Sequence, residues 1–167
     1  MKLILNGLLL IVALSLLFNP AFAEQKKSGY LLLADGSKIE FISLNQIDID
    51  GQTEEGRLIK SKDKRSSILF AHKGKEVKVS FDEIKEIEIK SYEVVKSGDN
   101  DFYLSNGTFR LVTQSKTFKN LSFDKFREVE VRVLDELSEK INTTTYRAGT
   151  SVNGKPVIQI RSIIFNR

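Results

Sequence analysis

A run of basic residues in the middle of the chain is the strongest chemical signal in the sequence. Between residues 57 and 78, only Asp63 and Glu76 oppose the basic side chains. If this segment forms a hairpin, the charges gather on one surface, where long-range attraction can hold an anionic partner. The alternative is a solvated loop whose lysines keep an edge strand from aggregating. The basic residues are Arg57, Lys60, Lys62, Lys64, Arg65, Lys73, Lys75 and Lys78.

Carboxylates offer two other kinds of chemistry. Asp82, Glu83, Asp124 and Glu128 can act as acid and base if the fold brings them together. Turn-capping aspartates and solvent-facing glutamates explain the same residues without catalysis. Residues 48–55 (DIDGQTEE) place hard oxygen ligands around a glycine, as calcium prefers, but their spacing misses the D-x-D-x-D-G loop. We therefore expect a polar hairpin over 48–55, and we expect no metal site.

Several classes of enzyme are excluded by composition. The chain has no cysteine, so a thiol nucleophile is impossible. His72 is the only histidine, which rules out a histidine-rich zinc site and leaves any Ser-His-Asp triad dependent on a residue at an expected hairpin tip. No glycine-rich phosphate loop is present. The sequence therefore predicts no cofactor.

The elements that must position these residues are strands. Charged and apolar residues alternate over 47–50, 77–81, 85–90 and 127–133. Alternation with a period of two places one set of side chains on a core and the other in water. Pairs that tolerate positive φ angles, at 35–36, 106–107 and 153–154, predict tight hairpin turns. The pattern predicts an all-β fold.

An internal repeat runs through these strands. Residues 79–90 (VSFDEIKEIEIK) and 121–132 (LSFDKFREVEVR) share Ser-Phe-Asp, two glutamates and the spacing of their apolar residues. A weaker third copy lies at 157–165. Self-similarity of this kind predicts a repeated supersecondary unit. The residues that define it are Phe81, Asp82, Ile84 and Ile87 in the first copy and Phe123, Asp124, Phe126 and Val129 in the second.

Each copy is interpreted as a strand, one 3₁₀ turn that the aspartate caps, and a second strand. This pattern resembles the closing corner of small SH3-like or Sm-like barrels. The predicted architecture is two small barrel-type units, 24–95 and 96–167. The alternative is one β-sandwich in a single continuous domain, 28–167. At most one short helix, or else a long turn, is expected near 135–141, where helix formers occur.

The N-terminus predicts export. Residues 1–23 contain a positive start, an apolar stretch and an Ala-Phe-Ala end, which is the order of a cleavable secretory signal. The apolar stretch is short for a membrane anchor, so we expect no transmembrane segment after cleavage. An exported domain without cysteine favours a bacterial envelope protein. The periplasm is the expected compartment, with secretion as the other possibility.

The function predicted from these features is binding or structural support in the cell envelope, without catalysis. The expected partner is an envelope protein, an anionic envelope polymer or a lipid headgroup, and no nucleic acid. Exposed alternating strands such as 86–90 can accept a strand from a partner. The alternative function is a carboxylate-dependent hydrolase that acts on a cell-wall polymer or glycan. The sequence does not determine the oligomeric state.

Overall fold

The structure is a computed structural model that describes residues 28–53, 55–60, 63–98 and 101–167, so the predicted signal peptide lies outside the described residues. The described residues form strands and one 3₁₀ turn, which confirms the predicted all-β class. The strands are β1 (Gly29–Leu33), β2 (Lys38–Phe41), β3 (Ser43–Gln52), β4 (Leu58–Ile59), β5 (Ser67–His72), β6 (Lys75–Ser80), β7 (Ile84–Lys96), β8 (Phe102–Thr113), β9 (Thr117–Asp135), β10 (Lys140–Arg147), β11 (Gly149–Val152), β12 (Lys155–Ile158) and β13 (Ile160–Phe165); η1 is Phe81–Glu83.

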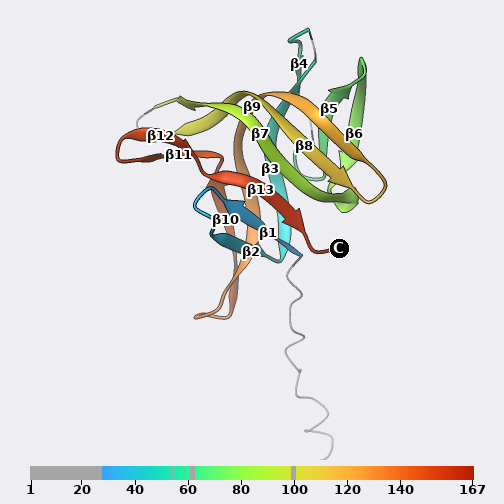
Figure 1. The fold of residues 1–167 in the computed structure, drawn as a ribbon. Helices are drawn as coiled ribbons and strands as arrows, with labels where there is room; N and C mark the ends of the chain where they lie inside the picture. Colours follow the sequence, from blue (N-terminus) through green and yellow to red (C-terminus); the bar gives the residue numbers. More distant parts are fainter. Residues whose placement is uncertain (1–27, 54, 61–62, 99–100) are drawn as a thin grey trace, which may run out of the picture.

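Nine strands form one antiparallel sheet (Figure 1). Its order is β2-β1-β13-β7-β8-β9-β3-β4, and β10 adds to β9. Strand β13, from the end of the chain, lies between β1 and β7, so strands from both halves of the sequence share this sheet. The hydrogen-bonded path through the described strands does not close on itself. Neither of the two predicted barrel units is therefore confirmed.

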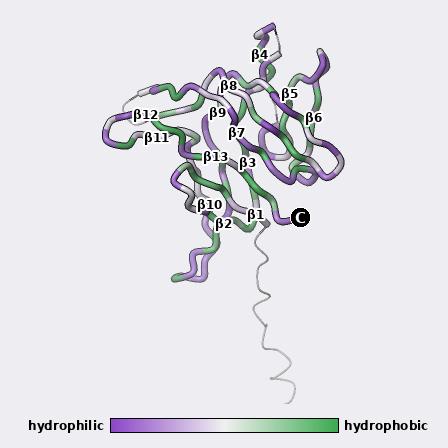
Figure 2. Tube along the Cα trace, in the orientation of Figure 1, coloured by the Kyte–Doolittle hydropathy of each residue, from purple (hydrophilic) through white to green (hydrophobic). Residues whose placement is uncertain are grey.

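Strand β9 organises the sheet because three strands pair with it. Residues 117–126 pair with β8, residues 123–132 with β3 and residues 128–135 with β10. The distal part of the β9–β10 hairpin extends away from the rest of the molecule, and its strands are mainly hydrophilic (Figure 2). Two further hairpins, β5–β6 and β11–β12, form separate two-stranded sheets.

The core is rich in phenylalanine and isoleucine. Phe70 contacts the rings of Phe109 and Phe118 edge-on, with centroids 6.3 and 5.1 Å apart, and Phe123 does the same with Phe126 at 6.4 Å. Such contacts join the β5–β6 hairpin to β8 and β9. Aromatic pairs of this geometry add stability beyond the area that they bury.

The first repeat copy has the expected backbone. Strand β6 ends in η1, and β7 begins at Ile84. The Ser80 hydroxyl accepts a hydrogen bond from the amide of Asp82 at 3.4 Å, so the cap comes from the serine and not from the predicted aspartate. Phe81, Ile84 and Ile87 are buried on the core side of this corner.

The second copy contradicts the predicted corner. Residues 121–132 all lie in β9, and Asp124 is an interior strand residue without a turn to cap. Phe123, Phe126 and Val129 are nevertheless buried. Spacings of three residues would put successive side chains on opposite faces of a regular strand. The register against β3 shifts between these residues, and the resulting bulges return each side chain to the core.

Two turn predictions have different outcomes. Asn106 and Gly107 lie inside β8, not in a turn; Asn106 has a φ of 46°, and a Cβ at Gly107 would lie 2.2 Å from the Phe123 ring. Near residue 135 the turn alternative is the one observed. Residues 136–139 form a turn, in which the Asp135 carboxylate accepts a bond from the amide of Leu137. The described residues contain no helix with the length and apolarity that crossing a membrane requires.

Candidate functional site

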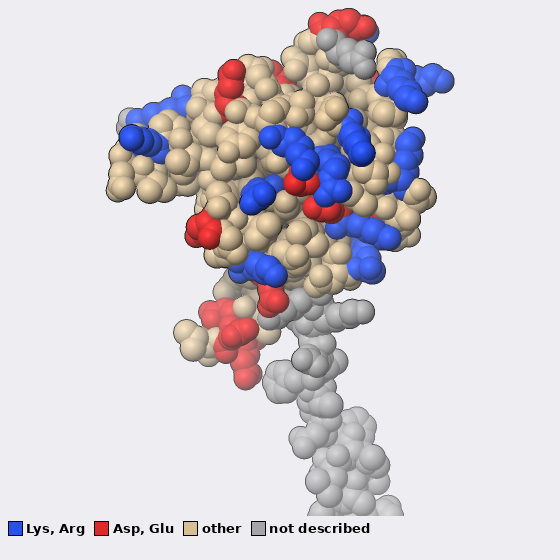
Figure 3. All heavy atoms as spheres, in the orientation of Figure 1, with Lys and Arg blue, Asp and Glu red and all other residues tan. Residues whose placement is uncertain are grey.

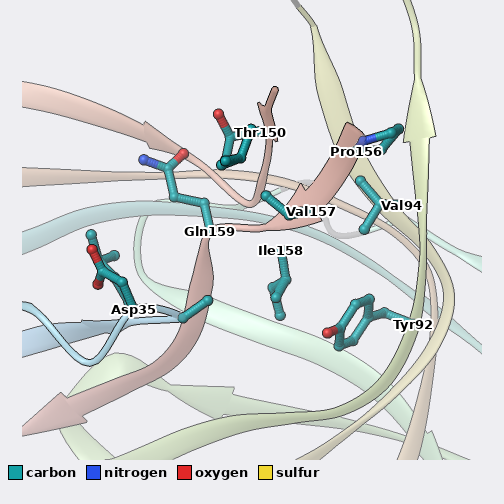
Figure 4. A pocket seen from close by; sticks show the side chains of 11 residues that line it. Asp35, Tyr92, Val94, Thr150, Pro156, Val157, Ile158 and Gln159 are labelled. Atoms are coloured by element: carbon teal, nitrogen blue, oxygen red, sulfur yellow. The ribbon is translucent and has the colours of Figure 1, made fainter. Parts of the chain in front are cut away.

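A hollow of about 600 Å³ opens between β7 and the β11–β12 hairpin, and we call it the apolar groove. Figure 4 shows Tyr92 and Val94 on the β7 side, with Val157 and Ile158 across from them. Hydrocarbon forms most of the walls, so a ligand would be held mainly by burial of its own apolar surface. The lining residues are Leu33, Ala34, Asp35, Tyr92, Val94, Thr150, Val152, Pro156, Val157, Ile158 and Gln159.

The groove exists because β13 leaves β7 early. The two strands pair only from Glu86 to Glu88, while β7 continues to Lys96 with β8 on its other side. Beyond Glu88, the second edge of β7 has no strand partner among the described residues. The residues before β13 could have continued the pairing with β7. They instead bend away at Gln159 and form β12.

Backbone bonds at Ala148 and Gln159 fix this departure. The carbonyl of Ala148 accepts bonds from the amides of Gln159 at 2.8 Å and Ile160 at 3.3 Å, and the carbonyl of Gln159 accepts one from Ala34. Next to this junction, a Cβ added to Gly149 would lie 3.2 Å from both Phe102 and Val94. The base of the β11–β12 hairpin therefore packs closely on β8 and β7, and the far wall of the groove is held in place.

The groove is exposed and continues past its apolar centre. Tyr92 is 40% exposed and Val152 55% exposed, which is high for side chains of this size. A second hollow, of about 420 Å³, shares Ala34, Tyr92 and Ile158 with the groove. Together the two hollows follow β7 from Glu88 to Val94.

Charged groups border this path. Lys90, Arg161 and Glu88 line the second hollow, and Asp35 lines the first. The hydroxyl and amide of Ser37 donate to the Asp35 carboxylate at 2.6 and 2.9 Å, and these bonds hold the pKa of Asp35 below its usual value. Asp35 is therefore an anion at neutral pH.

The predicted basic residues do not all lie on one surface. Lys73 and Lys75 lie at the tip of the β5–β6 hairpin, where Figure 3 shows basic side chains, and Lys60 and Arg65 are also exposed. Lys62 lies outside the described residues.

Three of the basic residues have acidic partners. Arg57 is 3.4 Å from Glu55, and Lys78 is 4.0 Å from Asp63. Lys64 turns inward to Asp48 and Asp50 and is not part of an exposed surface.

Lys64 belongs to a partly buried cluster of four charges, which we call the ionic cluster. Its ammonium donates to Asp48 and, at 3.0 Å, to Asp50; Arg127 donates to the same two carboxylates at 3.1 and 3.0 Å. Burial raises the pKa of Asp50, but the bonds from Lys64 and Arg127 outweigh it and leave the pKa lowered. The two aspartates that the calcium hypothesis considered are thus bonded to cations, and Glu54, another residue of that segment, lies outside the described residues.

The carboxylates considered for catalysis lie on separate elements. Asp82 and Glu83 belong to η1, whereas Asp124 and Glu128 belong to β9. The side chain of Asp82 is 96% exposed, and Glu128 accepts a bond from Arg147 at 2.6 Å. The described residues contain no group of three or more acidic or histidine side chains that could hold a metal ion.

The apolar groove was not predicted from the sequence. Its walls come from three distant segments, near residues 34, 92 and 157, and apolar residues in each are equally consistent with core strands. The partner strand predicted at 86–90 is placed too early, because β13 and β8 already occupy both edges of 86–88. Tyr92 between polar neighbours (SYE) was the available signal for an exposed aromatic side chain.

Comparison with protein-family models, curated proteins and solved structures gives no match to this chain.

Proposed function

We propose that this chain is an exported, non-enzymatic binding protein that holds an extended segment of an envelope protein in the apolar groove. The observation that carries the proposal is the edge of β7 beyond Glu88, which has no strand partner among the described residues and runs along the groove. An open edge offers amides and carbonyls to another strand, and the groove offers pockets for its side chains.

The dimensions suit a short strand. The two hollows follow β7 over residues 88–94, which corresponds to about 20 Å at the usual rise of a strand. A bound segment of about seven residues would add to β7 in the place that β13 leaves. Side chains that alternate along this segment would point into and out of the groove.

The lining defines the chemistry of the segment. Tyr92, Val94 and Ile158 favour aliphatic or aromatic side chains on the inward positions. Lys90 is already paired with Glu88 at 2.6 Å, so Arg161 is the cation that favours an acidic residue at the Glu88 end. The mainly apolar groove explains recognition of a protein segment better than recognition of a sugar polymer, which would need many hydrogen-bonding side chains.

Two observations support binding over hydrolysis. The carboxylates of Asp48 and Asp50 are each bonded to Lys64 and Arg127. The four carboxylates considered for catalysis are divided between η1 and β9, and none of them lines the apolar groove.

We also propose that residues 28–167 form a single domain. The interleaving of β13 between β1 and β7 supports this over separate units at 24–95 and 96–167. Only Ile42 separates β2 from β3, and its amide donates to the carbonyl of Arg132 at 2.8 Å. If β2 and β3 are considered as one bent strand, they join β1 to β9 and give the sheet a barrel-like arrangement.

Peptide selection tests the groove. Random eight-residue peptides would be selected on the chain without residues 1–23, and the enriched peptides measured by calorimetry. We expect alternating apolar residues and a loss of affinity when amides on one edge of the peptide are N-methylated. Tyr92→Arg should weaken binding at least tenfold, while Leu134→Arg, at a side chain of similar exposure on β9, should not.

Failure to enrich peptides, or equal losses in the two variants, would refute the proposed groove. Sedimentation of the purified chain distinguishes a related outcome: a dimer that Tyr92→Arg dissociates would make the occupant a second copy and the protein a structural subunit. Export is tested separately, by fractionating cells and sequencing the N-terminus of the mature protein, which we expect to be Glu24.

A further inference from the structure

Another hollow, of about 260 Å³ and separate from the two described above, lies beside the β3–β4 turn, the tip of the β5–β6 hairpin and the start of β9. We call it the cationic hollow. Three basic side chains from three separate segments line it: Arg57, Lys73 and Lys119. It lies on different elements from the apolar groove and shares no lining residue with it. Its chemistry therefore calls for a separate explanation.

The charges of the cationic hollow are only partly compensated. Glu55 also lines it and lies 3.4 Å from Arg57, but both side chains are at least 71% exposed, so the attraction between them is weak. Among the described residues, neither Lys73 nor Lys119 has an ion-pair partner. Because both lysines line the same hollow, an anion bound there would be attracted by both ammonium groups.

The backbone holds these side chains at the hollow. Lys73 has a φ of 53° and begins the β5–β6 turn with Gly74. Lys119 precedes Asn120, whose φ of 54° marks the register shift where β9 has one more residue than β8. Left-handed backbone is uncommon outside glycine and is worth explaining where it occurs. Here two such residues, on separate elements, border one polar hollow.

Neutral donors complete the lining. Ser122 and Asn120 line the hollow from β9. The Thr53 hydroxyl accepts a hydrogen bond from the backbone amide of Arg57 at 2.9 Å and so orders that turn. A guanidinium, two ammonium groups and neutral donors are the set that proteins use for phosphate oxygens, because charge-assisted bonds to them are strong.

We propose that the cationic hollow binds a phosphate group, carried either by a lipid headgroup or by a free phosphate compound. The exposed position at a hairpin tip allows both sources. Arg57 would bind two phosphate oxygens with its planar fork, and Lys73 and Lys119 would neutralise the remaining charge. The site works independently of the apolar groove.

The test measures binding of two probes to the chain without residues 1–23. One is inorganic phosphate, followed by shifts of backbone amide resonances at residues 53–57, 72–74 and 119–122. The other is a set of vesicles made of phosphatidylcholine with or without phosphatidylglycerol, followed by co-sedimentation. Lys73→Gln and Lys119→Gln are the test variants. Lys75→Gln, which removes an equal charge from the same hairpin outside the hollow, is the matched control.

We expect each test variant to weaken binding about tenfold, the effect of losing one charge-assisted bond, and the control to change it less than twofold.

The two probes distinguish the source of the phosphate. If the chain binds both inorganic phosphate and vesicles, a free phosphate group is a sufficient ligand; if it binds only phosphatidylglycerol vesicles, the ligand is a lipid headgroup. Equal losses in test and control variants would show general attraction to a basic surface and overturn the proposal, as would no binding of either probe. Tyr92→Arg should bind both probes normally, so failure of the apolar groove would not affect the outcome.

Discussion

The two repeat copies place nearly the same residues on different backbones. At residues 79–90 the chain turns through η1 between β6 and β7, whereas at residues 121–132 it continues through β9 with bulges. The flanks explain the difference. Strand β6 pairs with β5 in a separate hairpin, so the chain must change direction before β7; β9 has β3 and β8 on its two edges and stays in one sheet. The apolar spacing thus determines which side chains are buried. The neighbouring strands determine whether a turn or a bulged strand brings them to the core.

The largest expected effect compares the third apolar position of the two copies. Phe126 and Ile84 are 1% and 0% exposed. Phe126→Ala should lower the free energy of unfolding by about 3–5 kcal/mol and Ile84→Ala by about 2–4 kcal/mol, because each leaves a cavity in the core. Urea unfolding measures both. A loss below about 1 kcal/mol for Phe126→Ala would mean that the bulges do not return this side chain to the core.

A second comparison uses the next residue, which is Arg127 in β9 and Lys85 in β7. Arg127→Met removes two bonds from the ionic cluster and leaves Asp48 and Asp50 with Lys64 alone. We expect a loss of about 2 kcal/mol in urea unfolding, since hydrogen bonds to charged groups are stronger than neutral ones. Lys85→Met changes an exposed residue and should cost less than about 0.5 kcal/mol. Similar losses would contradict the assigned role of the ionic cluster.

The ionic cluster also predicts that the free energy of unfolding depends on pH. The folded pKa of Asp50 lies below its usual value, so the unfolded chain binds the proton more readily. The stability that this carboxylate contributes is complete above its unfolded pKa, about 4, and is lost as pH falls through the lower folded pKa. Unfolding measured from pH 7 to pH 2.5 should therefore show the stability gap between the native protein and Arg127→Met narrowing below about pH 4. A gap that stays constant over this range would contradict the prediction.

The smallest expected effect concerns the serine that both copies share. Ser80 caps η1 through a long bond, so Ser80→Ala should cost about 0.5 kcal/mol. Ser122 lies inside β9 and caps no turn, so Ser122→Ala should cost less. Thermal unfolding of the two variants side by side measures the difference. A larger loss at Ser122 would indicate a turn in β9 that the structure does not contain.

Alternation of charged and apolar residues was enough to predict the all-β class. The turns predicted at Asn106 and near Asp124 are not present, because both residues lie inside strands. A positive φ angle or an aspartate serves a bulge as well as a hairpin, and only the pairing of distant strands distinguishes them. The same limit applies to the sites. Lys64 appears in the sequence among other basic residues, and its bonds to Asp48 and Asp50 depend on how β3 passes the segment before β5. The apolar groove depends on where β13 leaves β7, which no local pattern records.

The pairing of β1 with β13 also affects when the molecule can fold. Residues 29–33 find their partners at residues 160–165, near the other end of the chain. Because β13 also joins β1 to β7, the sheet cannot be completed until residues 160–165 have been synthesised, and contacts so distant in sequence form slowly. If the chain is exported as the predicted signal peptide indicates, residues 29–33 stay without this partner until residues 160–165 have also crossed the membrane.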